Sequence, residues 1–128
     1  MRLLLDTHIA LWAVADDRRL SAKARSLIVD PANEIVVSTA SLWEIAIKHA
    51  LAPNDMPISA SEALGYFRKA GYELLDISPA HVIAVEALAA LHADPFDRIL
   101  VAQALNVPLR LLTHDPKVAS YSDSIIAV

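Results

Sequence analysis

Cysteine is absent from the 128 residues, and glycine occurs only twice, at Gly65 and Gly71. Without a thiol the chain can form no disulfide and no thiolate metal site, so a reducing cytoplasm is the expected compartment. Two isolated glycines also exclude a glycine-rich loop for nucleotide phosphates. Basic residues are few, since 11 lysines and arginines stand against 15 acidic residues, for a formal net charge of -4. Overall charge therefore does not attract nucleic acid, and any such contact needs a local basic patch.

Long apolar runs are lacking as well, although 55% of the residues are hydrophobic. The first run, Leu3–Leu5, meets Asp6 at once and is too short for a signal peptide or a membrane span. The hydrophobic residues are therefore expected to fill a core, with no contact to a membrane. The length predicts a single domain that covers residues 1–128.

Short aliphatic runs alternate with amphipathic segments along the chain. The predicted strands are Leu3–Leu5, Glu34–Val37, Glu73–Leu75, Leu109–Thr113 and Ser124–Ala127. Capping residues mark four of the helices between them, which are expected from Ser59 to Gly71, from Ser78 to about His92, from Ser41 onward, and from Asp94 to about Leu105. The alternation predicts an α/β fold with a central, mostly parallel sheet of four to five strands.

Four acidic residues stand where one predicted element meets the next: Asp6, Glu44, Asp97 and Asp115. In an open parallel sheet, the carboxyl ends of the strands form the crevice where ligands bind. Three or four carboxylates gathered there repel one another, and a hard divalent cation with oxygen ligands relieves that repulsion. The pattern favours a site for Mg²⁺ or Mn²⁺.

Each of these acids also has a purely structural explanation. Asp6 and Asp115 precede predicted helices, where a carboxylate caps backbone amides. Glu44 and Asp97 each stand three residues after a predicted N-cap, the position of the acid in a capping box. Taken singly, each acid fits a cap better than a ligand. Only the joint pattern favours a metal site.

Two basic residues lie beside the acids. Lys48 follows Glu44 by one helical turn and Arg98 is adjacent to Asp97, so each either binds a substrate phosphate or pairs with its acidic neighbour. The five histidines lack the spacing of a zinc site and are expected at surface or capping positions. Four aromatic residues lie at helical spacing among aliphatic ones, which favours the core over base stacking: Trp12, Trp43, Phe67 and Phe96.

Four segments carry these acids in a fixed order. They are Leu4–His8 (LLDTH), Ser41–Lys48 (SLWEIAIK), Asp94–Ala104 (DPFDRILVAQA) and Thr113–Asp115 (THD). The ordered set extends over nearly the whole chain and resembles the PIN-domain toxins of the VapC type. This resemblance implies a PIN-like three-layer α/β/α fold. It also implies a metal-dependent endoribonuclease that acts as the toxin of a type II toxin–antitoxin pair.

The resemblance assigns roles to particular residues. It implies that Mg²⁺ or Mn²⁺ is bound by the catalytic acids Asp6, Glu44, Asp97 and Asp115. Thr7 and Thr113 are similar to hydroxyl neighbours that orient the ligands or a bound water, and Asp94 is a further acid nearby. RNA is the implied substrate. The implied partners are a second copy of the chain and an antitoxin that inserts a segment into the active-site groove.

One departure from the family's pattern concerns the substrate. Relatives often continue after Lys48 with a Gly-Lys-Leu-like turn, whereas this chain reads His49-Ala50-Leu51. A basic substrate contact is therefore expected to be missing, which affects substrate preference more than catalysis.

Three other kinds of protein are alternatives, and the main one is a non-catalytic α/β domain. A receiver-like signalling domain needs two adjacent acids after the first strand and a lysine after the last, but here Asp6 is followed by Thr7 and the lysine is absent. A phosphatase that forms an aspartyl phosphate needs a second aspartate where His8 stands. A PIN-like domain that only binds a partner is the third alternative, and the presence of all four acids gives it no support.

Overall fold

A computed structural model describes all residues from 1 to 128, and its centre is one sheet. The strands are β1 (Arg2–Leu5), β2 (Glu34–Ser38), β3 (Glu73–Leu75), β4 (Arg110–Thr113) and β5 (Ile126–Ala127). They are ordered β3-β2-β1-β4-β5, and every neighbouring pair is parallel. The predicted parallel sheet is confirmed, with its last strand two residues shorter than expected.

Helices connect the strands. They are α1 (Thr7–Ala15), α2 (Ala22–Val29), α3 (Thr39–Leu51), α4 (Ala60–Lys69), α5 (Pro79–Ala84), α6 (Pro95–Asn106) and α7 (Pro116–Ala119), and a 3₁₀ turn at Val85–Ala87 follows α5. No helix is both long and apolar enough to span a lipid bilayer.

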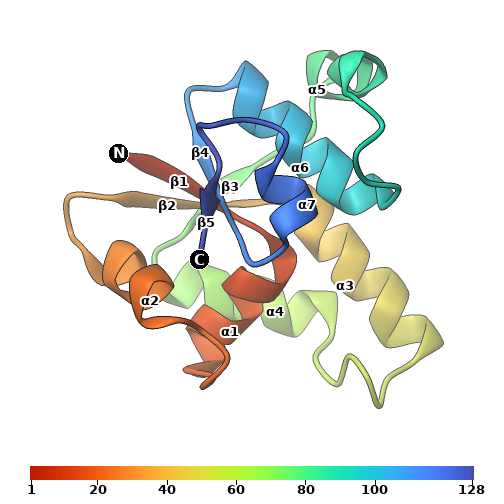
Figure 1. Cartoon of the computed structure of the whole chain (residues 1–128). Coiled ribbons are helices and arrows are strands. Elements are labelled where there is room, and N and C mark those ends of the chain that lie inside the picture. Colours follow the sequence, from red (N-terminus) through yellow and green to blue (C-terminus); the bar gives the residue numbers. More distant parts are fainter.

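The helices form a layer on each side of the sheet. Because side chains alternate along a strand, Leu3 and Leu5 join a core cluster on one face, whereas Leu4 joins the cluster on the other. Helices α1, α2 and α4 cover the first face, and α5 and α6 lie across the sheet from them (Figure 1). Phe67 of α4 is the largest fully buried side chain. The arrangement is the predicted three-layer α/β/α fold.

Two helix predictions were wrong. Helix α3 begins at Thr39 and not near Ser41, because the Ser38 hydroxyl at the end of β2 accepts a hydrogen bond from the Ala40 amide (3.0 Å). The helix after Ser78 stops well short of His92, and residues 88–94 form an irregular loop. The starts predicted at Ser59 and at Asp94 are confirmed by their capping bonds.

The prediction that all four aromatic residues lie in the core was also wrong. Phe67 is fully buried, but Trp43 is 56% exposed and packs edge-on against Phe96, with ring centroids 5.0 Å apart. Trp12 is only partly buried. Its neighbours are His8, His114 and Arg19, which belong to the site described next.

Candidate active site

A cleft of about 490 Å³ opens where β1, β2 and β4 end and the following helices begin. Asp6 directly follows β1, and Asp115 lies two residues after β4. Glu44 and Asp97 come from α3 and α6. The cleft is lined by all four predicted acids and seven other residues: Asp6, Glu44, Asp97, Asp115, His8, Trp12, Arg19, Lys48, Asp94, His114 and Pro116.

Asp6 caps helix α1 and also lines the cleft. One carboxylate oxygen, Oδ1, accepts a hydrogen bond from the Ile9 amide at 2.9 Å and so caps α1. The other oxygen, Oδ2, accepts one from the Thr113 hydroxyl at 2.7 Å and one from the His114 amide at 3.4 Å. The side chain is only 7% exposed. Burial raises the pKa of Asp6 above its ordinary value, although these hydrogen bonds partly offset the effect.

Glu44 does not cap its helix. It stands in the second turn of α3 and is 4% exposed, because the helix begins earlier than the sequence suggested. The Thr7 hydroxyl donates to Oε1 at 2.7 Å and fixes the carboxylate. Lys48, one turn later, forms an ion pair with Oε2. The capping explanation for Glu44 was therefore wrong, and the ion-pair alternative for Lys48 is confirmed.

Asp97 carries the most perturbed carboxylate. It accepts no hydrogen bond from a backbone amide, so it does not cap α6; that role belongs to Asp94, whose Oδ1 accepts from the Phe96 amide at 2.8 Å. Burial, followed by the negative charges of Asp94, Asp6 and Glu44, raises the pKa of Asp97 to about 7. The cleft thus concentrates negative charge that its own basic residues do not neutralise.

Asp115 meets a histidine that the sequence did not single out. Its Oδ1 accepts from the Lys117 amide at 2.8 Å and caps α7, while its Oδ2 lies 3.0 Å from His92 Nε2. Partial burial opposes the charge, but the Lys117 amide and the His92 ring outweigh it, so the pKa of Asp115 lies below its ordinary value. His92 Nε2 is also 3.2 Å from Asp97 Oδ2. The only indication in the sequence was that His92 stands two residues before Asp94.

Comparison with known proteins agrees with this geometry. A family model described as the PIN domain matches residues 3–123. Ribonuclease VapC22 of Mycobacterium tuberculosis is 30% identical over 122 residues, which cover 93% of this chain and 91% of that protein. The chain belongs to the PIN-domain family. The resemblance drawn from the sequence motifs is confirmed.

Solved structures show the same PIN-domain fold. VapBC2 from Rickettsia felis, bound to a DNA fragment from the promoter, aligns with a TM-score of 0.70 at 18% identity, over 100% of this chain and 98% of the other. VapBC-1 from nontypeable Haemophilus influenzae aligns with a TM-score of 0.67 at 15% identity, over 100% and 97% of the two chains. Such low identities support the fold alone.

Arg98 lies outside the cleft of this PIN domain. Its guanidinium donates to three backbone carbonyls, those of Val85 at 3.3 Å, Ala89 at 3.0 Å and His92 at 3.4 Å. It also donates to the Tyr121 hydroxyl at 3.0 Å. These bonds tie the segment 85–92 and Tyr121 to α6. The interpretation of Arg98 as a phosphate contact or as the ion-pair partner of Asp97 is corrected: it holds the loop 88–94.

The residues of the cleft suit a hard divalent cation. The donors are carboxylate oxygens, the ligand type that Mg²⁺ and Mn²⁺ prefer. Burial and the neighbouring carboxylates raise the pKa of Asp97 to about 7, and a bound cation would oppose both effects with its positive charge. Lys48 neutralises only Glu44. Residue chemistry and family membership therefore agree on a metal-binding PIN domain.

Replacing Asp97 with asparagine is expected to stabilise the metal-free protein. Because the folded pKa of Asp97 is raised from 3.8 to about 7, the folded state binds more protons than the unfolded state between these values. Its free energy of unfolding therefore falls as the pH rises from about 4 to about 7. Asp97→Asn removes this loss and gains on the order of 1–3 kcal/mol at about pH 8.

Chemical denaturation in EDTA across this pH range measures the effect. Asp123→Asn is the matched control, because Asp123 is exposed and lies outside the cleft. A variant Asp97→Asn that is less stable than the wild type at about pH 8 would contradict the electrostatic interpretation.

Replacing Arg98 with alanine is expected to lower the free energy of unfolding by about 1–3 kcal/mol, because loss of the guanidinium leaves backbone carbonyls of the 85–92 segment without a hydrogen-bond donor. Arg18→Ala, at an exposed position, is the control and is expected to stay within about 0.5 kcal/mol of the wild type. Equal stability of the two variants in urea denaturation would refute the role of Arg98 in holding the loop.

Proposed function

We propose that this PIN domain is a metal-dependent endoribonuclease of the VapC type that acts as the toxin of a toxin–antitoxin pair. The observation that carries the proposal is the charge of the cleft, where acids from four separate segments come together. Burial, followed by the charges of Asp94, Asp6 and Glu44, raises the pKa of Asp97 there to about 7. Family membership supports a ribonuclease, since the curated relative is named as one. The whole chain, 1–128, is proposed to act as one domain in the cytoplasm.

The site residues have distinct proposed roles. Asp6, Glu44 and Asp97 hold Mg²⁺ or Mn²⁺, and Asp115 completes that site or contributes to a second ion. When bound, the cation polarises a phosphoryl oxygen and lowers the pKa of the attacking water. Supporting residues fix the ligands: the Thr7 hydroxyl orients Glu44 and the Thr113 hydroxyl orients Asp6.

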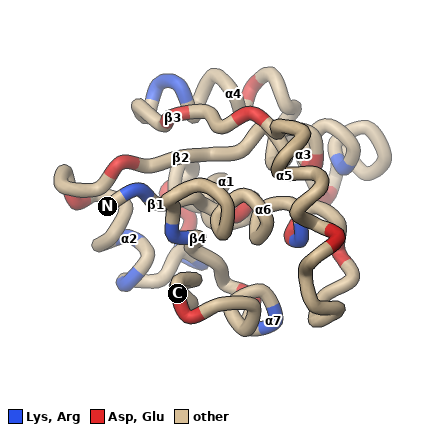
Figure 2. The backbone as a smooth tube through the Cα atoms, turned by 90° about the horizontal axis from the view of Figure 1, so that it is seen from above, with Lys and Arg blue, Asp and Glu red and all other residues tan.

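Basic side chains in the cleft are proposed to bind RNA, although the protein as a whole is acidic. Charged residues of both signs are scattered along the chain, with no long basic stretch (Figure 2). Within the cleft, Lys48 and Arg19 are the basic residues of fixed charge. Arg19 lies over the Trp12 ring, 5.2 Å from its centroid, and Asp17 holds it in place. The ion pair with Glu44 leaves the Lys48 side chain 42% exposed. We propose that Lys48, while paired with Glu44, and Arg19 contact the phosphates on either side of the scissile bond.

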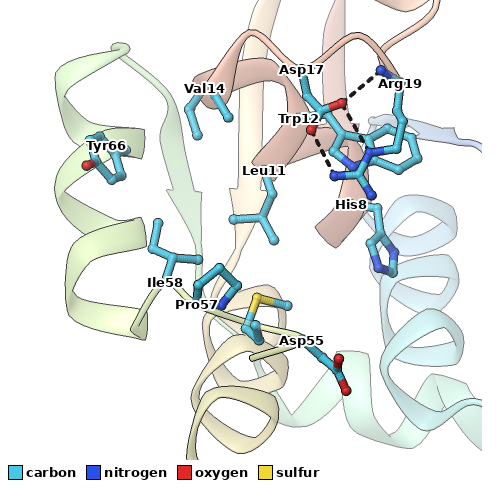
Figure 3. Close-up of a pocket in the computed structure, with 12 residues that line it drawn as sticks. His8, Leu11, Trp12, Val14, Asp17, Arg19, Asp55, Pro57, Ile58 and Tyr66 are labelled. Carbon is cyan, nitrogen blue, oxygen red and sulfur yellow. Dashed lines mark hydrogen bonds and ion pairs between the residues drawn. The ribbon is translucent and has the colours of Figure 1, made fainter. Parts of the chain in front are cut away.

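An apolar groove beside the cleft is the proposed binding site of the antitoxin. The groove has a volume of about 480 Å³ and shares His8, Trp12 and Arg19 with the acidic cleft. Its other residues are mostly apolar and come from α1, the α3–α4 connection and α4: Leu11, Val14, Ala15, Met56, Pro57, Ile58 and Tyr66, with Asp17 and Asp55 (Figure 3). An antitoxin segment with apolar side chains fits the groove, and a basic residue at its end would neutralise the adjoining acids.

A homodimer is also part of the proposal. Its support is the exposure of several large apolar side chains: Trp43 on α3, and Val82 and Ile83 on α5, are each more than half exposed. Burial of such side chains against a second copy removes them from water.

Cleavage of RNA by the purified protein tests the proposed activity. We expect cleavage in Mg²⁺ or Mn²⁺, none in EDTA, and a loss of at least about 10³-fold in Asp97→Asn, because one ligand of the cation is removed. Asp123→Asn is the control, with the same change of charge outside the cleft. Cleavage that survives EDTA or Asp97→Asn would place the activity elsewhere. No cleavage of any RNA, together with a preserved partner complex, would favour the non-catalytic alternative.

The groove proposal predicts a separation of binding from cleavage. Tyr66 is half exposed in the apolar groove and does not line the acidic cleft. Tyr66→Glu is therefore expected to weaken binding of the antitoxin by about 10-fold or more, because it places an unpaired charge in an apolar contact. RNA cleavage by the free toxin is expected to stay unchanged. Calorimetry with the antitoxin and a cleavage assay without it measure the two effects. Unchanged antitoxin affinity would show that the antitoxin does not bind in this groove.

A further inference from the structure

His92 connects two acids of the cleft that belong to different elements. It lies in the irregular loop 88–94, and its side chain is 18% exposed. Its Nε2 atom is 3.0 Å from Asp115 Oδ2 and 3.2 Å from Asp97 Oδ2. Together these three side chains can place one ligand atom each within 4.8 Å of one another. His92 is therefore either a ligand of the cation or a hydrogen-bond donor to its ligands.

The other ring nitrogen decides between these roles. The Asp94 amide donates a hydrogen bond to His92 Nδ1 at 3.1 Å. A nitrogen that accepts a hydrogen bond carries no proton, so the ring proton is on Nε2. Nε2 then has no lone pair in the plane of the ring to offer a metal. It is a donor to the two carboxylates.

The surrounding loop holds the ring in this orientation. The His92 amide donates to the Tyr121 hydroxyl at 3.0 Å, and the His92 carbonyl accepts from Arg98 at 3.4 Å. Arg98 also donates to the same Tyr121 hydroxyl. Backbone and ring of His92 are thus fixed from α6, from the segment after α7 and from the cap of α6. These contacts hold the ring where its Nε2 atom meets Asp97 and Asp115.

We propose that His92 is a positioning residue that orients Asp97 and Asp115 for the cation, because its single Nε2–H group is shared as a hydrogen-bond donor between the two carboxylates. The inference rests on the proposed metal-dependent function. By engaging Oδ2 of both acids, His92 leaves Asp97 Oδ1 for the cation, and it holds the side chain of Asp115, which is 39% exposed, against the cleft. Donors of this kind behind metal ligands typically contribute about 10–100-fold to metal affinity.

Substitutions of His92 that keep or remove the donor test the proposal. The amide nitrogen of His92→Gln reaches about as far as Nε2, whereas that of His92→Asn reaches only as far as Nδ1, and His92→Ala has no donor. We expect the dissociation constant for Mn²⁺, measured by electron paramagnetic resonance of the free ion, to rise about 10-fold or more in His92→Ala and His92→Asn. His92→Gln is expected to recover most of the affinity. Thermal unfolding in EDTA checks that each variant is folded.

Nitrogen coupling to the bound Mn²⁺ provides the second readout. We expect no coupling from a directly bound imidazole in the wild type. A coupling that disappears in His92→Gln would make His92 a ligand and overturn the proposal. Equal Mn²⁺ affinity of the wild type and the folded His92→Asn variant would overturn it as well, while leaving the proposed nuclease intact. Failure of the wild type to bind Mn²⁺ at all would overturn the proposed function and this inference with it.

Discussion

Repulsion among carboxylates is the constraint on which the rest of this structure depends. Five acids line one cleft, and burial together with the charges of Asp94, Asp6 and Glu44 opposes the ionisation of Asp97. The fold maintains this arrangement by burying the sheet beneath it on both faces and by giving each acid a fixed partner, such as the Thr7 hydroxyl for Glu44 and the Thr113 hydroxyl for Asp6. Stability elsewhere in the domain holds together a site that would otherwise spread apart.

Capping and ligation are compatible roles in this site. A carboxylate has two oxygens, and in Asp6 and Asp115 one oxygen caps a helix while the other faces the neighbouring polar groups. A helix that starts at the end of a parallel strand brings its N-terminal amides to the edge of the sheet where ligands bind. The acid that satisfies those amides therefore also has an oxygen at the edge where the proposed cation would bind.

The sequence predicted the helices and strands that local patterns define. It failed for features that depend on contacts with residues far away in the chain. Alternating aliphatic runs located all five strands, and the pairing of Ser59 with Glu62 located α4. The start of α3 was misplaced because Ser38 and Ser41 are equally good caps in sequence, and only the end of β2 selects Ser38. His92 was not singled out because its partner Asp115 is 23 residues away. Arg98 was misread because the loop that folds back onto it and the Tyr121 hydroxyl, also 23 residues away, leave no local pattern.

In Asp6 and Asp115 the two carboxylate oxygens have different hydrogen-bond partners, and this has a genetic consequence. Asparagine keeps the capping oxygen of Asp6 or Asp115 and replaces the other with a neutral amide, and one base change in the codon is enough to make this exchange. Neither residue lines the apolar groove, so the exchange would leave that groove unchanged. If Asp6 and Asp115 hold the cation as proposed, one such exchange would turn an active copy into a form that no longer cleaves RNA but still competes for the antitoxin.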